Sequence, residues 1–364
     1  MMNMKKLLAA LLALTMVLSL AACAQEETPA ESTQAAVATE AAPETTVAPE
    51  TTAAPETTEA QEPAERIDAD LINVMVLNGT TGFGMANLMD AYDKGESAQN
   101  YNFSVETDAS NIVAALANGS VDIAALPTNA AATVYNKTQG KVQVLALNTL
   151  GVLYLVASND SVTIESVEDL AGWNVYAPAQ NPSFIFQHIL EANGLTDVTI
   201  DNTYAQPADL NTAVASGEVS IAVLPEPMVT VAKSKNPELK VLLDLTEEWD
   251  KVAPAGSLVQ GCVVVRKEFA EQNPDAVAAF LEEYGASIEA LTTDIEGTAA
   301  KIEATGIFNK AAVAAKAIPN CNVCFITGED MKAALSEFLN IMYGVAPASV
   351  GGAIPGDDFY CILN

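Results

Sequence analysis

The ten residues NGSVDIAALP at positions 118–127 return as SGEVSIAVLP at positions 216–225. Six of the ten positions are identical, and the copies are 98 residues apart. Each copy has a glycine suited to end a helix, then a short apolar strand and a proline turn. A spacing this long does not fit a solenoid repeat. The repeat therefore indicates two lobes of similar architecture, or else the chance recurrence of a common α/β unit.

On both sides of the repeat, short β-rich runs alternate with amphipathic helices, the pattern of an α/β protein. Open α/β sheets bind ligands at the carboxyl ends of their strands, so the loops after the two copies would face each other across a cleft. Expected strands lie at 72–77, 103–107, 121–126, 142–147 and 173–177, and expected helices include 110–118 and 183–193.

The composition excludes several classes of function. The 364 residues carry a formal charge of −31, whereas nucleic acid and anionic lipid surfaces are bound through Lys and Arg. With one histidine, two-histidine metal sites and most base-driven hydrolase triads are ruled out. We therefore expect no nucleic-acid partner, no metal and no cofactor.

The amino-terminal segment has the features of an export signal, predicted for residues 1–22. Lys5 and Lys6 precede the apolar run LLAALLALTMVLSL, which is too short for a membrane-spanning helix. The run ends in Leu20-Ala-Ala-Cys23, which resembles the bacterial lipobox. That resemblance implies lipidation of Cys23 with acyl chains such as palmitate and anchoring on the outer face of the cell membrane. The alternative is an ordinary signal peptide followed by a chance cysteine.

Residues 23–65 are predicted to be a disordered linker. The stretch 24–65 contains ten Glu, no Lys or Arg and no aromatic residue, and Ala-Pro-Glu-Thr-Thr occurs three times in it. Such a segment cannot bury enough apolar surface to offset the entropy lost on ordering. A flexible chain of this length would span roughly 35 Å. We expect it to act as a tether.

Two further motifs suggest a family. The pattern Ser166-x-x-Asp-Leu-x-Gly172 precedes a strand, and Gly217-x-Val-x-Ile-Ala-x-x-x-Glu-Pro227 spans the second repeat. Together they resemble the solute-binding proteins of ABC importers for nitrate, sulfonate, taurine and thiamine-precursor pyrimidines. The similarity covers about residues 70–345.

This resemblance implies the two-lobed periplasmic-binding-protein (type II) fold with two hinge crossovers. Lobe 1 would comprise 67–157 plus 259–364, and lobe 2 would comprise 158–258. The expected protein is a monomer that captures a small organic solute between its lobes. It would deliver that solute to an ABC permease and its ATPase.

Candidate ligand-binding residues occupy the loops at the expected cleft. Hydroxyls and free N–H groups at helix starts suit a carboxylate, a sulfonate or a ring carbonyl. Phe83 and Phe184 would be able to sandwich a flat ring, although isolated aromatics more often belong to a core. The Glu226 carboxylate would accept a hydrogen bond from an amine of the solute, or else it is only a negative charge at the start of a helix. The set is Thr80, Thr81, Gly82, Phe83, Thr128, Asn129, Gln180, Asn181, Ser183, Phe184 and Glu226.

The charge of these loops favours one class of solute. None of them contains Lys or Arg, which phosphate or bare nitrate sites usually require. The prediction is therefore a neutral, zwitterionic or amine-bearing solute, such as a pyrimidine-type precursor or an aminosulfonate.

Two rival functions remain open at this point. Pyrimidine-synthesising enzymes resemble these binders but need a particular histidine, and the one histidine here, His188, lies inside an expected helix without a companion base. An enzyme is therefore the weaker alternative. The other rival is an exported ligand-sensing subunit for a signalling partner. The four cysteines of the folded part are either all free thiols, or two of them form one disulfide; they are Cys262, Cys321, Cys324 and Cys361.

Overall fold

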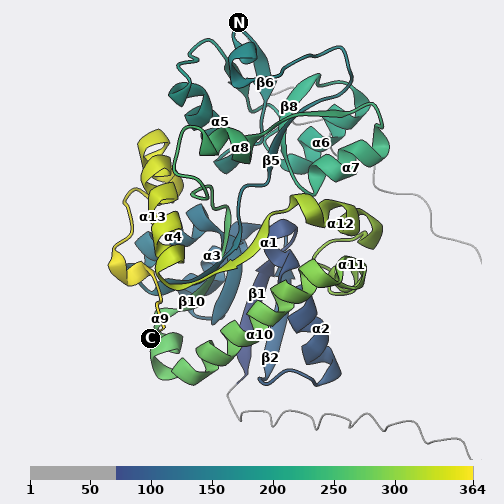
Figure 1. Ribbon diagram of the computed structural model, residues 1–364. Coiled ribbons are helices and arrows are strands. Elements are labelled where there is room, and N and C mark those ends of the chain that lie inside the picture. Colours follow the sequence, from purple (N-terminus) through teal and green to yellow (C-terminus); the bar gives the residue numbers. More distant parts are fainter. Residues whose placement is uncertain (1–70, 364) are drawn as a thin grey trace, which may run out of the picture. The chain divides into compact units, whose positions relative to one another are not determined.

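The computed structural model of the protein describes residues 71–363. The predicted signal peptide, the lipidation site at Cys23 and the linker 23–65 lie outside these residues. Within the described part, the chain forms two mixed β-sheets with helices packed on them (Figure 1). The predicted α/β fold is confirmed. We call the six-stranded sheet with its helices lobe 1, and the five-stranded sheet with its helices lobe 2.

The sheet of lobe 1 has the strand order β11-β4-β10-β3-β1-β2. Strand β1 runs parallel to β2 and β3, whereas β10 runs antiparallel to β3 and β4. The strands are β1 (Ile72–Leu77), β2 (Tyr101–Glu106), β3 (Ile123–Pro127), β4 (Val142–Thr149), β10 (Gly261–Arg266) and β11 (Val323–Ile326).

The sheet of lobe 2 repeats this pattern in the order β7-β6-β8-β5-β9. Strand β6 runs parallel to β7 and β8, and β5 runs antiparallel to β8 and β9. The two copies of the sequence repeat thus form the equivalent strands β3 and β8, which confirms two lobes of similar architecture. The strands are β5 (Leu153–Ala157), β6 (Asn174–Tyr176), β7 (Thr199–Asp201), β8 (Ile221–Pro225) and β9 (Lys240–Asp244).

The chain passes from one sheet to the other twice, between β4 and β5 and between β9 and β10. The range 67–157 predicted for lobe 1 includes β5, but β5 pairs with β8 and β9 of the other sheet. This error has a simple cause. Every residue of β5 is buried, and a fully apolar run shows that a strand is covered on both faces without showing which sheet it joins.

Helices cover both faces of the lobe 1 sheet. Along β3, Ala124 and Leu126 face a core with α3, α4 and α13, whereas Ile123 and Ala125 face a core with α2, α10 and α11. This alternation follows from the two-residue period of a strand. The helices are α1 (Thr80–Phe83), α2 (Ala86–Lys94), α3 (Ala109–Asn118), α4 (Thr128–Thr138), α9 (Lys267–Gln272), α10 (Pro274–Thr293), α11 (Ile295–Ala304), α12 (Ala311–Ala317), α13 (Gly328–Val345) and the 3₁₀ turns η2 (Ile318–Asn320), η3 (Pro347–Val350) and η4 (Asp357–Phe359).

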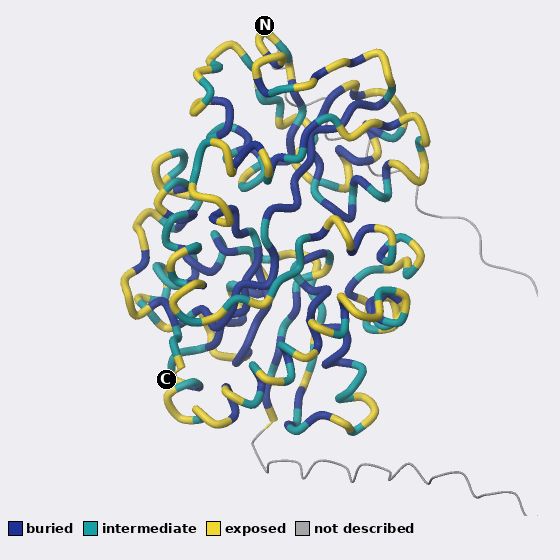
Figure 2. Tube along the Cα trace, in the orientation of Figure 1, coloured by how far each residue is buried: buried dark blue, intermediate teal, exposed yellow. Residues whose placement is uncertain are grey.

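The helices of lobe 2 pack on both sides of β5 and β8. Ser166 and Asp169 form a capping box at the first of these elements, a 3₁₀ turn. Figure 2 shows buried segments in the interior of the described chain, and among the strands β3, β4, β5, β8 and β10 are buried along most of their length. The elements are η1 (Val167–Leu170), α5 (Asn181–Ala192), α6 (Pro207–Ser216), α7 (Met228–Lys235) and α8 (Leu245–Asp250).

One apolar cluster contains residues of both lobes. Trp249 of α8 in lobe 2 is fully buried, and its ring centroid lies 5.9 Å from that of Phe338 in α13 of lobe 1. Further α13 residues, Met331 and Leu335, belong to the same cluster. Helix α13 therefore forms an apolar seam between the lobes.

Candidate functional site

A cavity of about 440 Å³ lies between the lobes, a size suited to a small organic molecule. Lobe 1 contributes the beginning of α3, one face of α4 from Asn129 to Lys137 and the turn η3, and lobe 2 contributes the start of α5. The polar and aromatic side chains at its wall are those of Asp108, Ser110, Asn129, Thr133, Lys137, Gln180, Phe184 and Ser349.

The three helix starts follow from the local sequence. Asp108 has an extended backbone, and its carboxylate accepts a hydrogen bond from the backbone N–H of Ser110 at 2.8 Å, which caps α3. Helix α4 begins directly after Pro127, and α5 begins after Gln180, whose φ of 66° turns the chain sharply. Helix starts present backbone N–H groups that lack a partner within the helix. All three starts follow a strand at its carboxyl end, where α/β sheets bind their ligands.

The cavity wall carries one basic and one acidic side chain. The backbone and hydroxyl hydrogen bonds from Ser110 lower the pKa of Asp108, so this carboxyl is ionised at neutral pH. Lys137 lies on the same face of α4 as two other wall residues, because Asn129, Thr133 and Lys137 are spaced four residues apart. Lys137 is not among the predicted ligand residues, because it lies inside a helix and not in a loop. Its four-residue spacing from Thr133, and that of Thr133 from Asn129, is the sequence signal for its place at the wall.

Three of the predicted ligand residues line this cavity: Asn129, Gln180 and Phe184. Asn129 comes from lobe 1, whereas Gln180 and Phe184 come from lobe 2. Amide groups donate and accept hydrogen bonds, and a half-buried phenyl ring offers an apolar surface. Together with Lys137 and Asp108, the wall can pair with both an anionic and a cationic group of one small molecule.

Thr80 and Glu226 meet each other instead of facing the cavity. The Thr80 hydroxyl donates to the backbone carbonyl of Glu226 at 2.9 Å, which joins lobe 1 to lobe 2. The Glu226 carboxylate is only 4% exposed and accepts from the N–H and the hydroxyl of Thr230, at 3.1 and 2.9 Å. Burial raises the pKa of Glu226, and the bonds from Thr230 and from the Asn320 side chain oppose that rise.

The remaining predicted residues of lobe 1 make contacts within the fold. The Thr128 hydroxyl is fully buried and donates to the Val259 carbonyl at 2.7 Å. The Thr81 carbonyl accepts from the side chain of Asn148 at 3.1 Å. Gly82 packs so tightly that an added Cβ would collide with the carbonyl oxygen of Leu77.

The predicted aromatic sandwich does not form. Phe83 is fully buried in the core of lobe 1 and packs edge-on against Phe308, with ring centroids 6.2 Å apart. Phe184 alone lines the cavity. The sequence could not separate the two rings, because both follow a strand and begin a helix.

Two predicted residues lie beside the cavity wall at the start of α5. The Ser183 hydroxyl is buried and donates to the Pro178 carbonyl at 2.7 Å, which holds the turn before the helix. The side-chain oxygen of Asn181 is buried and has no hydrogen-bond partner among the described residues.

His188 lies in α5, as predicted, with its ring centroid 4.8 Å from that of Trp249. Burial lowers its pKa, so the imidazole is neutral at pH 7. His188 does not line the cavity between the lobes. In the part of the chain that the structure describes, Cys262, Cys321, Cys324 and Cys361 are free thiols.

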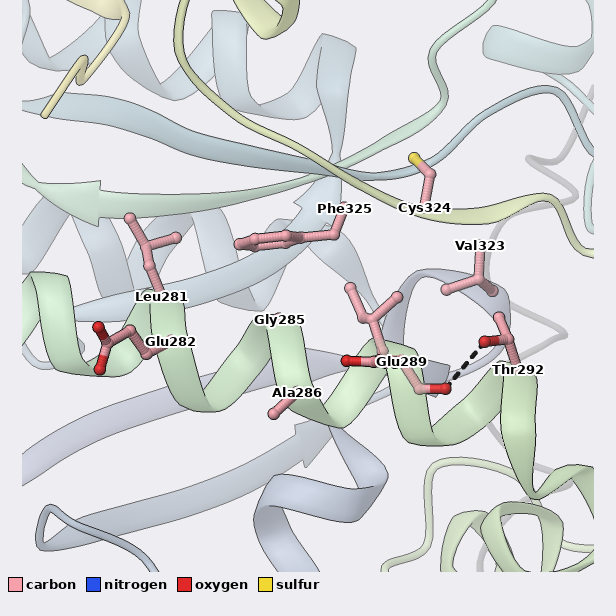
Figure 3. Close-up of a pocket in the computed structure, with 10 residues that line it drawn as sticks. Leu281, Glu282, Gly285, Ala286, Glu289, Thr292, Val323, Cys324 and Phe325 are labelled. Carbon is pink, nitrogen blue, oxygen red and sulfur yellow. Dashed lines mark hydrogen bonds between the residues drawn. The ribbon is translucent and has the colours of Figure 1, made fainter.

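A second cavity, of about 650 Å³, belongs to lobe 1 alone. It is an open groove between α10 and β11, in which Phe325 lies over Gly285 and the carboxylates of Glu282 and Glu289 stand at the rim (Figure 3). None of the predicted ligand residues lines it. The cavity between the lobes is therefore the candidate functional site.

Comparison with known families identifies the chain. Residues 94–316 match the family model described as the substrate-binding domain of the ABC-type glycine betaine transport system. The chain belongs to this family. The match covers more than half of the sequence, and it agrees with the resemblance inferred from the 166–172 and 217–227 motifs.

Solved structures share the fold. An ABC transporter structure from Parabacteroides distasonis has a TM-score of 0.68 and 24% identity, and covers 80% of this chain and 98% of its own. The periplasmic aliphatic sulphonate-binding protein from Escherichia coli has a TM-score of 0.64 and 16% identity, over 78% and 91% of the chains. The alkanesulfonate-binding protein from Xanthomonas axonopodis, bound to MOPS, has a TM-score of 0.58 and 14% identity, over 82% and 96%.

These findings establish the protein as a substrate-binding protein of the ABC import systems, with the periplasmic-binding-protein fold. A small-molecule solute and an ABC transporter are the partners of this extracytoplasmic family. No curated protein sequence matched the chain. Among residues 71–363, no helix is both long and apolar enough to cross a membrane.

Proposed function

We propose that this protein captures a small zwitterionic solute in the cavity between its lobes and delivers it to an ABC permease. The observation that carries the proposal is the presence of both Lys137 and Asp108 on the wall of a cavity of about 440 Å³. One cation and one carboxylate suit a solute that bears an acidic and an amino group.

The rest of the wall agrees with this chemistry. Backbone N–H groups at the helix starts add donors for a sulfonate or a carboxylate. Phe184 suits the apolar or alkylammonium part of the solute, because a ring face attracts cations. The family description names glycine betaine, and the Xanthomonas relative was solved with the zwitterionic sulfonate MOPS. We therefore favour an aminosulfonate or a betaine over a pyrimidine-type precursor.

Membrane attachment is part of the same proposal. The export signal and the lipobox-like Leu20-Ala-Ala-Cys23 support a lipid on Cys23, with residues 24–65 as the tether to the binding domain. Intact-mass analysis of the protein extracted from cell membranes would measure the acyl groups. A Cys23→Ser variant that stays equally membrane-bound and lipidated would contradict this part.

A thermal-shift panel tests the choice of solute. Taurine and glycine betaine carry both charges, ethanesulfonate and choline carry one each, and sulfate and nitrate are simple oxyanions. We expect the melting temperature to rise with the zwitterions and to change much less with the others, because binding stabilises only the folded state. A rise with sulfate or nitrate alone would overturn the proposal.

A further inference from the structure

A polar turn of lobe 1 reaches across to lobe 2. This turn, residues 318–322, joins α12 to β11 and comprises η2 and the two residues that follow it. The backbone carbonyl of Asn320 accepts from the hydroxyl of Tyr154 in β5 at 3.0 Å. The Asn320 side chain lies near the buried carboxylate of Glu226, which follows β8, and opposes the rise of its pKa. The turn thus bonds one element of lobe 2 and lies beside a second.

Neighbouring bonds extend this contact. The side chain of Asn322 donates to the carbonyl of Gly151 at 2.6 Å, and its own carbonyl accepts from the N–H of Leu150 at 3.0 Å. Both partners lie in the segment that crosses from β4 to β5. Asn322 has a φ of 43°, in the left-handed region that asparagine tolerates better than most residues. The turn is therefore fixed to the crossover as well as to lobe 2.

The Thr80 bond to the Glu226 carbonyl completes the set, with Thr80 and Glu226 both buried. The Thr80 hydroxyl also lies 3.7 Å from the Cys321 sulfur, within the same turn. None of these residues lines the solute cavity, so the contact does not depend on the solute.

The contact differs in kind from the apolar seam at α13. The seam buries large side chains such as Trp249 and Phe338, and separating them would expose much apolar surface. The turn instead offers a few hydrogen bonds, which water can replace when the lobes part. Asn320 is itself exposed, so its bonds can exchange with solvent without unfolding.

We propose that the 318–322 turn and the adjacent Thr80 form an interlobe latch, in which the Asn320 carbonyl holds Tyr154 and the Thr80 hydroxyl holds the Glu226 carbonyl, and that this latch biases the protein toward the closed arrangement of its lobes. The latch rests on the proposed function in one respect, because closing of the lobes serves the capture of the solute. Tyr154 and Thr80 would then be positioning residues that raise solute affinity without touching the solute. A binding-competent state that is more populated before binding gives a higher apparent affinity.

The test measures the distance between the lobes in the full-length protein without solute. Spin labels on a keto amino acid at Glu96 of lobe 1 and Asp197 of lobe 2, both exposed, avoid the native cysteines. Double electron–electron resonance then gives the closed and open populations. We expect Tyr154→Phe, which removes the bond to the Asn320 carbonyl, and Thr80→Val, which removes the bond to the Glu226 carbonyl, each to lower the closed-to-open ratio about two- to tenfold, the range for one hydrogen bond.

Tyr101→Phe is the matched control. It also removes a buried tyrosine hydroxyl, but that hydroxyl bonds Glu283 at 2.6 Å within lobe 1. The control should lower the melting temperature and leave the distance distribution unchanged. Unchanged distributions in folded Tyr154→Phe and Thr80→Val, or an equal change in Tyr101→Phe, would overturn the latch.

Adding taurine or glycine betaine separates the two proposals. These solutes are expected to shorten the distance in the wild type. If they do so, but the latch variants without solute have the same distance distribution as the wild type without solute, the latch fails and the proposed function stands. If the variants open as expected but neither solute binds, the latch stands and the proposed solute class fails.

Discussion

The two copies of the repeat form equivalent strands in the two lobes, but the segments that follow these strands differ. After β3 the chain enters α4, whose exposed side contributes Asn129 and Lys137 to the cavity. After β8 the equivalent position to Thr128 is Glu226, which is buried and bonded across the lobes. The strand core is thus shared, whereas the segment after it lines the cavity in lobe 1 and bonds the other lobe in lobe 2.

The largest expected effect tests whether the strands are equivalent. Leu126 in β3 and Leu224 in β8 occupy the same repeat position, and both are fully buried. Changing either one to Ala should lower the free energy of unfolding by about 2–5 kcal/mol, because methyl groups are lost and a cavity remains. Denaturant titration measures the loss, and Leu71→Ala at an exposed position serves as control. A loss below about 1 kcal/mol at either strand would break the comparison.

A second pair of residues, Lys137 and Lys235, tests the difference between the helices that follow β3 and β8. Lys137 of α4 lines the cavity, and the repeat spacing places Lys235 of α7 at the corresponding position, exposed and away from it. We expect Lys137→Met to weaken taurine binding about tenfold, or about 1.4 kcal/mol, because an anion partner is lost. Lys235→Met should leave the affinity unchanged in the same calorimetric titration. Equal losses in both variants would show a general charge effect instead of a site.

The smallest effect is the pH dependence of Glu226. Because burial raises its pKa in the folded state, the neutral form is favoured there. The stability this contributes is present below the ordinary glutamate pKa of about 4.3 and is lost as pH rises through the raised value. Glu226→Gln should therefore become more stable relative to the wild type as pH rises from about 4.5 to 7. Glu238→Gln, at an exposed site of lobe 2, controls for the lost charge.

Chemical denaturation at several pH values measures the difference in unfolding free energy between Glu226→Gln and the wild type. A stability difference between Glu226→Gln and the wild type that stays constant over this range would show that Glu226 has no raised pKa. The change should be modest, since hydrogen bonds from Thr230 and Asn320 oppose part of the effect of burial on the pKa of Glu226.

Much of the fold could be predicted because it depends on local pattern. The short apolar run after Asp122 marks a strand, and Thr327 and Asn273-Pro274, residues typical of a helix start, lie where α13 and α10 begin. Part of the site could be predicted as well, since Asn129, Gln180 and Phe184 lie at helix starts that follow strands. Lys137 could not be predicted from the loops, because it lies two helical turns beyond the start of α4.

The sequence by itself determined the two-lobed α/β architecture, because apolar periodicity and the repeat are encoded in neighbouring residues. It also determined the acidic character of the chain and its likeness to ABC solute binders. Only the tertiary structure decided which predicted residues face the cavity. Phe83, Thr128 and Glu226 share the local sequence context of their neighbours but are buried by distant segments, including the crossover and the 318–322 turn. Burial is set by packing between segments far apart in the chain, which no local pattern records.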